Sequence, residues 1–139
     1  MTEGRRGGTV KGIGSPKGSY AQTAEPRARA IVPIVSVQNS YNLSDRSSDQ
    51  VIDFCAGENI AFIPYFPLAI GSLARRGSHL RSVAARYEAT PGQIALAWLL
   101  KRSPAMLPIP GTSSIDHLEE NMKAAAIRLS DDDFAALGN

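Results

Sequence analysis

The 139-residue chain lacks most of the features that mark a secreted or membrane protein. Its one cysteine, Cys55, cannot form an intrachain disulfide, which fits a reducing compartment such as the cytoplasm. No apolar run approaches the ~18 residues that a membrane-spanning helix needs. The basic residues near the N-terminus are not followed by the apolar segment of a secretory signal. We therefore expect a cytoplasmic protein that does not bind membranes.

Strong charge and familiar catalytic motifs are also missing. The net charge is only +2 and most arginines are scattered, which argues against a nucleic-acid partner. The sequence has no Gly-x-Gly-x-x-Gly after a strand, no Ser/His/Asp motif and no metal-ligand spacing. Cys55 has the spacing of a buried helix residue, His79 suits a solvated helix face, and Asp131–Asp133 suits a helix cap better than a cation site. No catalytic or metal-binding residue is predicted.

What the chain does have is an alternation of predicted strands and helices after a glycine-rich start. Residues 1–30 carry few apolar side chains and predict a weakly structured leader with one short strand near Val10. Apolar and β-branched segments predict strands at 34–38, 60–65 and 105–109. Strand-then-helix repetition predicts a parallel sheet with helical crossovers, and hence an α/β fold.

Capping residues mark the expected helix starts. Ser47 followed by Gln50 predicts one start, and the run Thr90–Gln93, with Pro and Gly between its ends, predicts another. The second helix carries Ile94–Leu100, which is apolar on every side and is therefore expected to be buried. Ser130 is predicted to cap a short terminal helix.

The most informative segment is Leu107–Asn121, a short apolar stretch followed by a Pro/Gly turn, a run of hydroxyls and an amphipathic helix. A helix N-terminus has unpaired N–H groups and a positive dipole end, so it attracts phosphate. Ser113 with Asp116 makes a capping box, which also explains the hydroxyls without any ligand. The apolar stripe of the helix consists of Ile115, Leu118 and Met122.

Polar or aromatic side chains follow two of the predicted strands. Gln38–Asn42 come after the first and Tyr65–Leu68 after the second. Such positions line the active face in parallel α/β folds. On pattern alone, Gln38 and Asn39 are better explained by satisfying backbone groups in a turn, and a lone Tyr such as Tyr65 more commonly occupies a core position near a turn.

The segment Leu107–Asn121 resembles the last strand–turn–helix of the aldo/keto reductases, and residues 31–139 as a whole are similar to that family. The resemblance implies the C-terminal half of a (β/α)8 TIM barrel, with parallel strands and covering helices. Residues 1–30 match loosely. There, Ser15-Pro16 replaces the Ser-Asn pair that usually holds the nicotinamide amide, so one cofactor contact is lost or altered.

The resemblance implies NADP as the cofactor, with NAD as the alternative. Gln38 matches a residue that bonds the nicotinamide carboxamide, Tyr65 matches the aromatic residue that stacks on the nicotinamide ring, and Thr112–Ser114 match the turn that holds the 2′-phosphate. The implied cofactor-binding residues are Gln38, Tyr65, Phe66, Pro67, Leu68, Gly111, Thr112, Ser113, Ser114, His117, Glu120 and Asn121.

The chain departs from the family pattern at two positions. His117 stands where many members carry Arg, and Gly111 where many carry Lys or Arg. Both departures remove fixed positive charge, so only a modest preference for NADP over NAD is expected. The family's catalytic Asp, Tyr, Lys and His belong to the first four strands, and no residue of this chain corresponds to them.

Two functions follow from different classes. The chain is either the cofactor-binding part of an oxidoreductase that reduces small carbonyl substrates, or a non-catalytic truncated remnant or binding module of the same fold. We expect the chain alone to be inactive. Open parallel edges near Val10 and Leu107 are a liability for association, so a complementing N-terminal half or self-association is expected.

Overall fold

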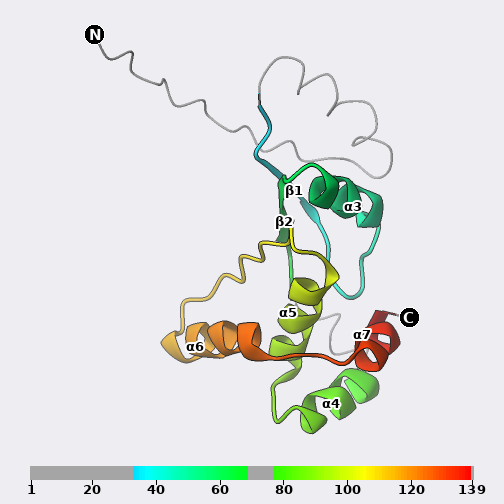
Figure 1. The fold of residues 1–139 in the computed structure, drawn as a ribbon. Coiled ribbons are helices and arrows are strands. Elements are labelled where there is room, and N and C mark those ends of the chain that lie inside the picture. Colours follow the sequence, from blue (N-terminus) through cyan, green and yellow to red (C-terminus); the bar gives the residue numbers. More distant parts are fainter. Residues whose placement is uncertain (1–32, 69–76, 139) are drawn as a thin grey trace.

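The structure of the protein, a computed structural model, describes residues 33–68 and 77–138. The elements in chain order are β1 (Ser36–Ser40), α3 (Asp49–Gly57), β2 (Ala61–Tyr65), α4 (Gly77–Arg86), α5 (Pro91–Arg102), α6 (Ile115–Lys123), a 3-10 turn (Ala124–Ala126) and α7 (Asp131–Gly138) (Figure 1). No helix within the described ranges is long and apolar enough to cross a bilayer. The leader and the strand expected near Val10 lie outside those ranges.

β1 and β2 lie side by side and run in the same direction, with α3 connecting them. Ser36 pairs with Ala61 at one end of the ladder and Ser40 with Tyr65 at the other. A parallel pair needs a crossover connection, and a helix usually supplies it. This arrangement confirms the predicted strand–helix–strand unit.

The bounds of β1 differ from the prediction. The strand was expected at 34–38 but runs from Ser36 to Ser40, because the ladder with β2 extends to its last residue. Gln38 and the two residues after it therefore lie within the strand rather than in a following turn. Val35 lies just before the ladder and is 63% exposed.

The strand predicted at 105–109 is wrong in extent, because only a single parallel bridge to β2 remains. The Phe62 N–H donates to the Ala105 carbonyl at 2.7 Å, and the Leu107 N–H donates to the Phe62 carbonyl at 2.8 Å. The next donor that β2 would offer in such a ladder is residue 64, and Pro64 has no N–H. Pairing therefore stops at one bridge.

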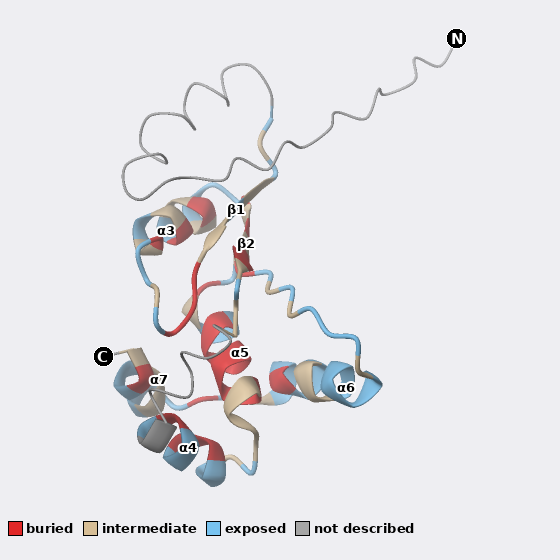
Figure 2. Ribbon diagram, turned by 180° about the vertical axis from the view of Figure 1, so that it is seen from behind, coloured by how far each residue is buried: buried red, intermediate tan, exposed pale blue. Residues whose placement is uncertain are grey.

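α5 occupies the centre of the hydrophobic core (Figure 2). Ile94–Leu99 are all at most 3% exposed, which confirms the predicted burial, whereas Leu100 is 39% exposed. The Trp98 ring stacks on the rings of Tyr41 and Phe134, at centroid distances of 6.0 and 5.3 Å. Three segments far apart in the sequence thus meet on α5, which joins the sheet to the C-terminal helix.

The caps of α5 and α7 form as predicted. The Gln93 N–H donates to Thr90 Oγ1 at 3.2 Å, and the Thr90 N–H donates to Gln93 Oε1 at 2.9 Å. Ser130 Oγ accepts from the Asp133 N–H at 3.1 Å. Reciprocal bonds of this kind satisfy N–H groups that a helix start leaves unpaired.

The start of α3 is one residue later than predicted. Its N-cap is Ser48 rather than Ser47, and Ser48 makes no side-chain cap bond. Instead, Ser48 Oγ donates to the carbonyl of Ser40 at 3.1 Å, while Ser47 Oγ donates to Asp45 at 2.7 Å. Both hydroxyls hold the loop between β1 and α3 rather than the helix start.

α6 buries none of its own residues. It begins at the far end of an extended segment that leads away from the sheet (Figure 1). The predicted apolar stripe faces solvent: Ile115 is 75% exposed, Leu118 52% and Met122 68%. Only where α6 passes into the 3-10 turn does the chain rejoin the core, at Ala124.

Candidate functional site

The parallel ladder brings the C-terminal ends of β1 and β2 to one edge of the sheet. Gln38 is exposed on β1, and Tyr65, partly exposed, is the last residue of β2. The ends of neighbouring parallel strands are where α/β folds place binding residues. Two of the predicted cofactor-binding residues therefore lie on neighbouring strands.

The polar side chains that follow Gln38 form local hydrogen bonds with the strand end and the loop after it. Asn39 Oδ1 accepts from the Ser40 N–H at 2.9 Å, and Ser40 Oγ donates to Asp45 Oδ2 at 2.8 Å. The alternative explanation, that such residues satisfy groups in a turn, therefore holds for Asn39. It does not account for Gln38, whose side chain is exposed.

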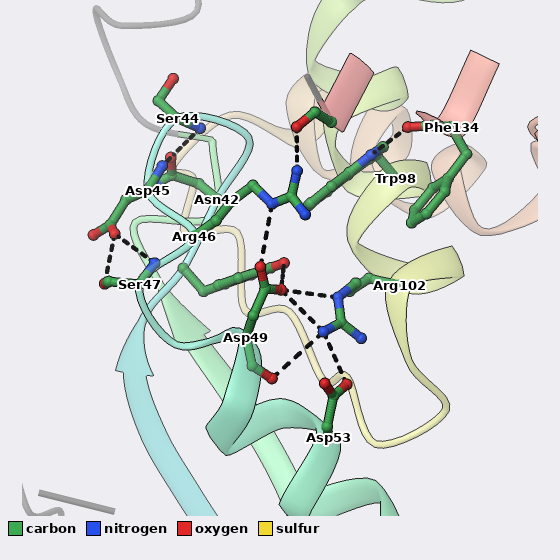
Figure 3. Close-up of polar contacts among 12 residues, drawn as sticks. Asn42, Ser44, Asp45, Arg46, Ser47, Asp49, Asp53, Trp98, Arg102 and Phe134 are labelled. Carbon is green, nitrogen blue, oxygen red and sulfur yellow. Dashed lines mark hydrogen bonds and ion pairs between the residues drawn. The ribbon is translucent and has the colours of Figure 1, made fainter. Parts of the chain in front are cut away.

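A partly buried polar cluster is centred on Asp49 and Arg102 (Figure 3). Tyr41 is fully buried and its hydroxyl donates to Asp49 at 2.6 Å, while Arg102 contacts both Asp49 and Asp53 at 2.9 Å. Burial first, and the hydrogen bond to the carboxylate second, raise the pKa of Tyr41 to about 12. Burial opposes ionisation of Asp49, but hydrogen bonds from Tyr41 and Arg102 outweigh it and lower the pKa of Asp49. The cluster ties α3 to the end of α5 and holds Tyr41 protonated.

The end of β2 presents an aromatic pair. The rings of Tyr65 and Phe66 meet edge to face, with centroids 5.6 Å apart and planes at 78°. Phe66 is 67% exposed and has a left-handed backbone, with φ of 53°. Pro67 and Leu68 follow, both half-buried, and Leu68 packs against the core. These residues and Gln38 are called the strand-end group below.

One residue of this region was missed by the sequence analysis. Asn42 is only 5% exposed, and its Nδ2 donates to the carbonyl of Phe66 at 3.2 Å. It therefore links the loop after β1 to the end of β2. The available signal was an Asn at the start of a short polar loop, where its side chain commonly bonds the backbone two residues on.

The second candidate region is the turn before α6. Thr112 Oγ1 accepts from the Ser114 N–H at 3.1 Å, and Ser114 Oγ accepts from the His117 N–H at 3.4 Å. Ser114 is the N-cap, so the capping box predicted for Ser113 with Asp116 is wrong. The cap moves by one residue because Thr112 fixes the Ser114 amide, and Ser113 is left exposed.

The remaining predicted residues lie around this turn and along α6. A side chain added at Gly111 would meet no atom within 4 Å. His117 is exposed, whereas Glu120 and Asn121 are half-buried. The Glu120 carbonyl accepts from Gln93 Nε2 at 3.0 Å, which attaches α6 to the start of α5. Gly111–Ser114 with His117, Glu120 and Asn121 are called the turn group below.

The two groups differ in chemistry and in place. The strand-end group offers flat rings and an amide, whereas the turn group offers hydroxyls and helix N–H groups, which suit phosphate. Figure 1 shows the N-terminus of α6 at the end of the extended segment, away from β1 and β2. Across residues 33–68 and 77–138 no three His, Cys, Asp or Glu side chains gather as a metal site would require. Cys55 is buried and His79 is exposed, as predicted.

A model of the aldo/keto reductase family matches residues 1–139. Over 137 residues the chain is 47% identical to pyridoxine 4-dehydrogenase of Escherichia coli, which covers 99% of this chain and 47% of that protein. Over 110 residues it is 53% identical to an uncharacterised oxidoreductase of Schizosaccharomyces pombe, which covers 79% of this chain and 36% of the relative. The chain thus spans less than half the length of these two curated relatives.

Solved structures agree with this match. A thermostable aldo-keto reductase crystallised with the inhibitor epalrestat superposes with a TM-score of 0.76 at 29% identity, over 91% of this chain and 46% of that one. An aldo-keto reductase from Klebsiella pneumoniae, crystallised with NADPH, gives 0.76 at 24% identity, over 91% and 45%. These neighbours are (β/α)8 barrels, so the fold predicted from the sequence, parallel strands and helices forming part of such a barrel, is confirmed.

Proposed function

This chain belongs to the aldo/keto reductase family, and we propose that it supplies the cofactor-binding portion of an NADP-dependent oxidoreductase acting on small carbonyl compounds. The observation that carries the proposal is the exposed hydroxyl turn in front of α6. Thr112 and Ser113 are open to solvent there, and Gly111 has open space around it. A helix N-terminus with the exposed Ser113 hydroxyl beside it fits the phosphate end of a nucleotide.

The nicotinamide end is assigned to the strand-end group. Tyr65 and Phe66 offer aromatic surface to a flat ring, and Gln38 offers an exposed amide to the carboxamide. Flat contact of this kind costs little conformational entropy. The Klebsiella pneumoniae neighbour was crystallised with NADPH, which supports a nicotinamide nucleotide as the ligand.

The adenosine-phosphate end is assigned to the turn group. The hydroxyls and the helix dipole favour the 2′-phosphate of NADP, but neither Gly111 nor His117 supplies a fixed positive charge. Binding of NADP is therefore expected to be weak, with only a modest preference over NAD. Glu120 and Asn121 are proposed to reach the adenine, with His117 at the adenine–phosphate end.

The catalytic acid is proposed to come from a part of the barrel that these 139 residues do not span. When bound, the cofactor would supply a hydride to the substrate carbonyl, and the carbonyl oxygen would need a proton from an acid. Tyr41 is a poor donor because it is buried, bonded to Asp49 and has a pKa of about 12. This chain's own residues therefore bind and orient the cofactor.

The uncovered apolar surfaces support a partner for the chain. Leu107 and Ile109 are each 53% exposed beside the single-bridged edge, and the stripe of α6 is exposed as well. Large apolar patches on a protein surface mark interaction sites. We propose that a complementing half of the barrel covers them, with a second copy of this chain as the competing occupant. The single buried cysteine suits a cytoplasmic location.

Nucleotide binding by the 139-residue chain tests the cofactor assignment. Ser113→Asp places a carboxylate in the turn without removing the Ser114 cap, so calorimetry should record weaker NADP binding. Gln50→Glu is the matched control, because it adds one negative charge in the exposed first turn of α3. Equal NADP binding by Ser113→Asp and the parent rules out the turn group. If none of the proteins binds a nucleotide, the result favours the alternative, a non-catalytic remnant or binding module of the same fold.

A turnover assay tests whether the catalytic acid lies outside this chain. The chain alone should not oxidise NADPH with a panel of aldehydes that includes pyridoxal, a substrate type suggested by the name of the Escherichia coli relative. Mixed with the N-terminal half of that relative, it should gain activity. Robust turnover by the chain alone, abolished by one substitution in it, contradicts the proposal that the acid lies elsewhere.

A further inference from the structure

Phe66 holds an unusual backbone conformation for a bulky residue. Its φ of 53° lies in the left-handed region, which residues other than Gly, Asn and Asp rarely adopt. Its ring is 67% exposed, so burial of the side chain does not hold it there. Strained residues of this kind persist where the surroundings fix them, and they cluster at binding sites. A contact to the Phe66 backbone is the alternative way to hold this conformation.

Within residues 33–68 and 77–138, the side chain of Asn42 hydrogen-bonds the Phe66 backbone. Its Nδ2 donates to the Phe66 carbonyl across 24 positions of sequence, and it is 5% exposed. Its other polar groups are all used locally. Asn42 Oδ1 accepts from the N–H groups of Ser44 and Asp45 at 2.8 and 3.0 Å, and its backbone N–H and carbonyl pair with Asp45 (Figure 3).

Asn42 is therefore a fixed donor rather than an adaptable one. Rotating its amide would break bonds to two backbone N–H groups in a nearly buried site, which is costly. The loop that carries it is anchored in turn, since Ser40 Oγ bonds Asp45 and Ser48 Oγ bonds the Ser40 carbonyl. The position of the Phe66 carbonyl is thus set from β1.

We propose that Asn42 is a positioning residue for the nicotinamide end of the site: it holds Phe66 left-handed and so sets the edge-to-face pair of Phe66 and Tyr65 against the ligand ring. The proposal rests on the function proposed above, because it takes the strand-end group as the place of the ring. Asn42 itself does not touch the ligand. Its effect is to remove alternative orientations of the aromatic pair before binding.

The test compares Asn42→Asp with Asn39→Asp in the full 139-residue chain. The first variant keeps an oxygen acceptor for Ser44 and Asp45 but replaces the donor with an anion that repels the Phe66 carbonyl. The second adds the same charge nearby and keeps the acceptor that Asn39 offers to the Ser40 N–H. Each is titrated with NADPH and with adenosine 2′,5′-bisphosphate, which lacks the nicotinamide.

We expect Asn42→Asp to weaken NADPH binding roughly three- to tenfold, the range that an aromatic contact commonly contributes. Binding of the bisphosphate should not change, and Asn39→Asp should leave both ligands unaffected. A merely structural role would weaken both ligands together. That result, or unchanged NADPH binding by Asn42→Asp, overturns the proposal.

Ligand binding by the parent and the folding of Asn42→Asp distinguish failure of this proposal from failure of the proposed function. If the parent binds neither ligand, the proposed function fails and this role of Asn42 fails with it, whereas binding by the parent leaves the variants to decide. Far-UV circular dichroism and the fluorescence of Trp98 report whether Asn42→Asp folds. If it does not, Asn42→Ser replaces it, since its hydroxyl can still accept from the loop amides but is too short to reach Phe66, and the same selective loss of NADPH is required.

Discussion

α5 and α6 show how differently two neighbouring helices of one chain can be used. α5 is buried along Ile94–Leu99 and carries Trp98 into a stack of three rings, whereas α6 buries none of its residues. Both begin with a side-chain cap, from Thr90 and from Ser114. Local capping therefore does not distinguish them, but contact with the core does. Stability should reside in α5, and ligand chemistry in the segment before α6.

The largest expected effect is a loss of stability on truncating the ring at the centre of α5. Trp98→Ala removes the stack with Tyr41 and Phe134 and the bond from Trp98 Nε1 to the Phe134 carbonyl. Urea unfolding should show a loss of about 3–5 kcal/mol in the free energy of unfolding. Leu118→Ala on α6 is the matched truncation and should change it by less than about 0.5 kcal/mol. Similar losses would erase the distinction between the helices.

A smaller effect is expected where the end of α5 meets α3. Asp49→Asn weakens the charge-assisted bonds from Tyr41 and Arg102, and should cost about 1.5–3 kcal/mol at neutral pH. Because folding lowers the pKa of Asp49, its ionised form stabilises the fold above the unfolded pKa, and this contribution is lost as the pH falls through the folded pKa. The gap in unfolding free energy between parent and variant should therefore shrink in acid. A gap that is constant with pH would assign the loss to packing.

Gln93 is the polar link between the two helices, and its removal should act mainly on α6. Gln93→Ala deletes the donor to the Glu120 carbonyl and half of the α5 capping box. We expect a loss of about 1 kcal/mol in global stability. Amide hydrogen exchange should accelerate in α6 more than in the middle of α5. Exposed Gln50→Ala serves as the control, and uniform acceleration throughout the chain would contradict a local attachment.

The smallest expected effect concerns charge at the turn. Gly111→Lys restores a cation where a side chain has open space, so stability should be unchanged. NADP affinity should rise by up to about fivefold, and NAD affinity less, because one partly exposed charge adds under about 1 kcal/mol. Gly57→Lys adds the same charge at another open glycine and should not alter binding. An equal gain in both variants would indicate general attraction rather than a phosphate site.

The sequence predicted those features that depend on residues close together in the chain. The apolar run in α5, its capping box and the parallel strand–helix–strand unit all follow from local patterns. The caps of α3 and α6 are each displaced by one residue, because adjacent serines have the same capping chemistry and side-chain bonds outside the cap choose between them. Ser48, for instance, turns to the Ser40 carbonyl instead of capping.

The site was harder to predict than the fold. The residues of the strand-end and turn groups come from the family resemblance, and their binding roles stay predictions. The hydrogen bond from Asn42 to the Phe66 carbonyl joins segments that follow two different strands, and no pattern in either segment alone predicts it. Likewise, the loss of the strand at 105–109 depends on Pro64, a residue of another strand. Both depend on pairing that a single sequence does not display.

Pro64 also determines how α6 is connected to the sheet. By ending the ladder at Leu107, it releases Pro108–Ser114 as a tether that spans roughly 25 Å when fully extended. The other end of α6 is fixed by the bond of Gln93 to Glu120 and by buried Ala124. α6 is thus attached to the core at its C-terminal end, whereas its N-terminal end is joined to the sheet through residues 108–114. Under the proposed function, the length of that segment sets the effective concentration of the turn group at the strand ends, so shortening it should change ligand affinity without removing a contact residue.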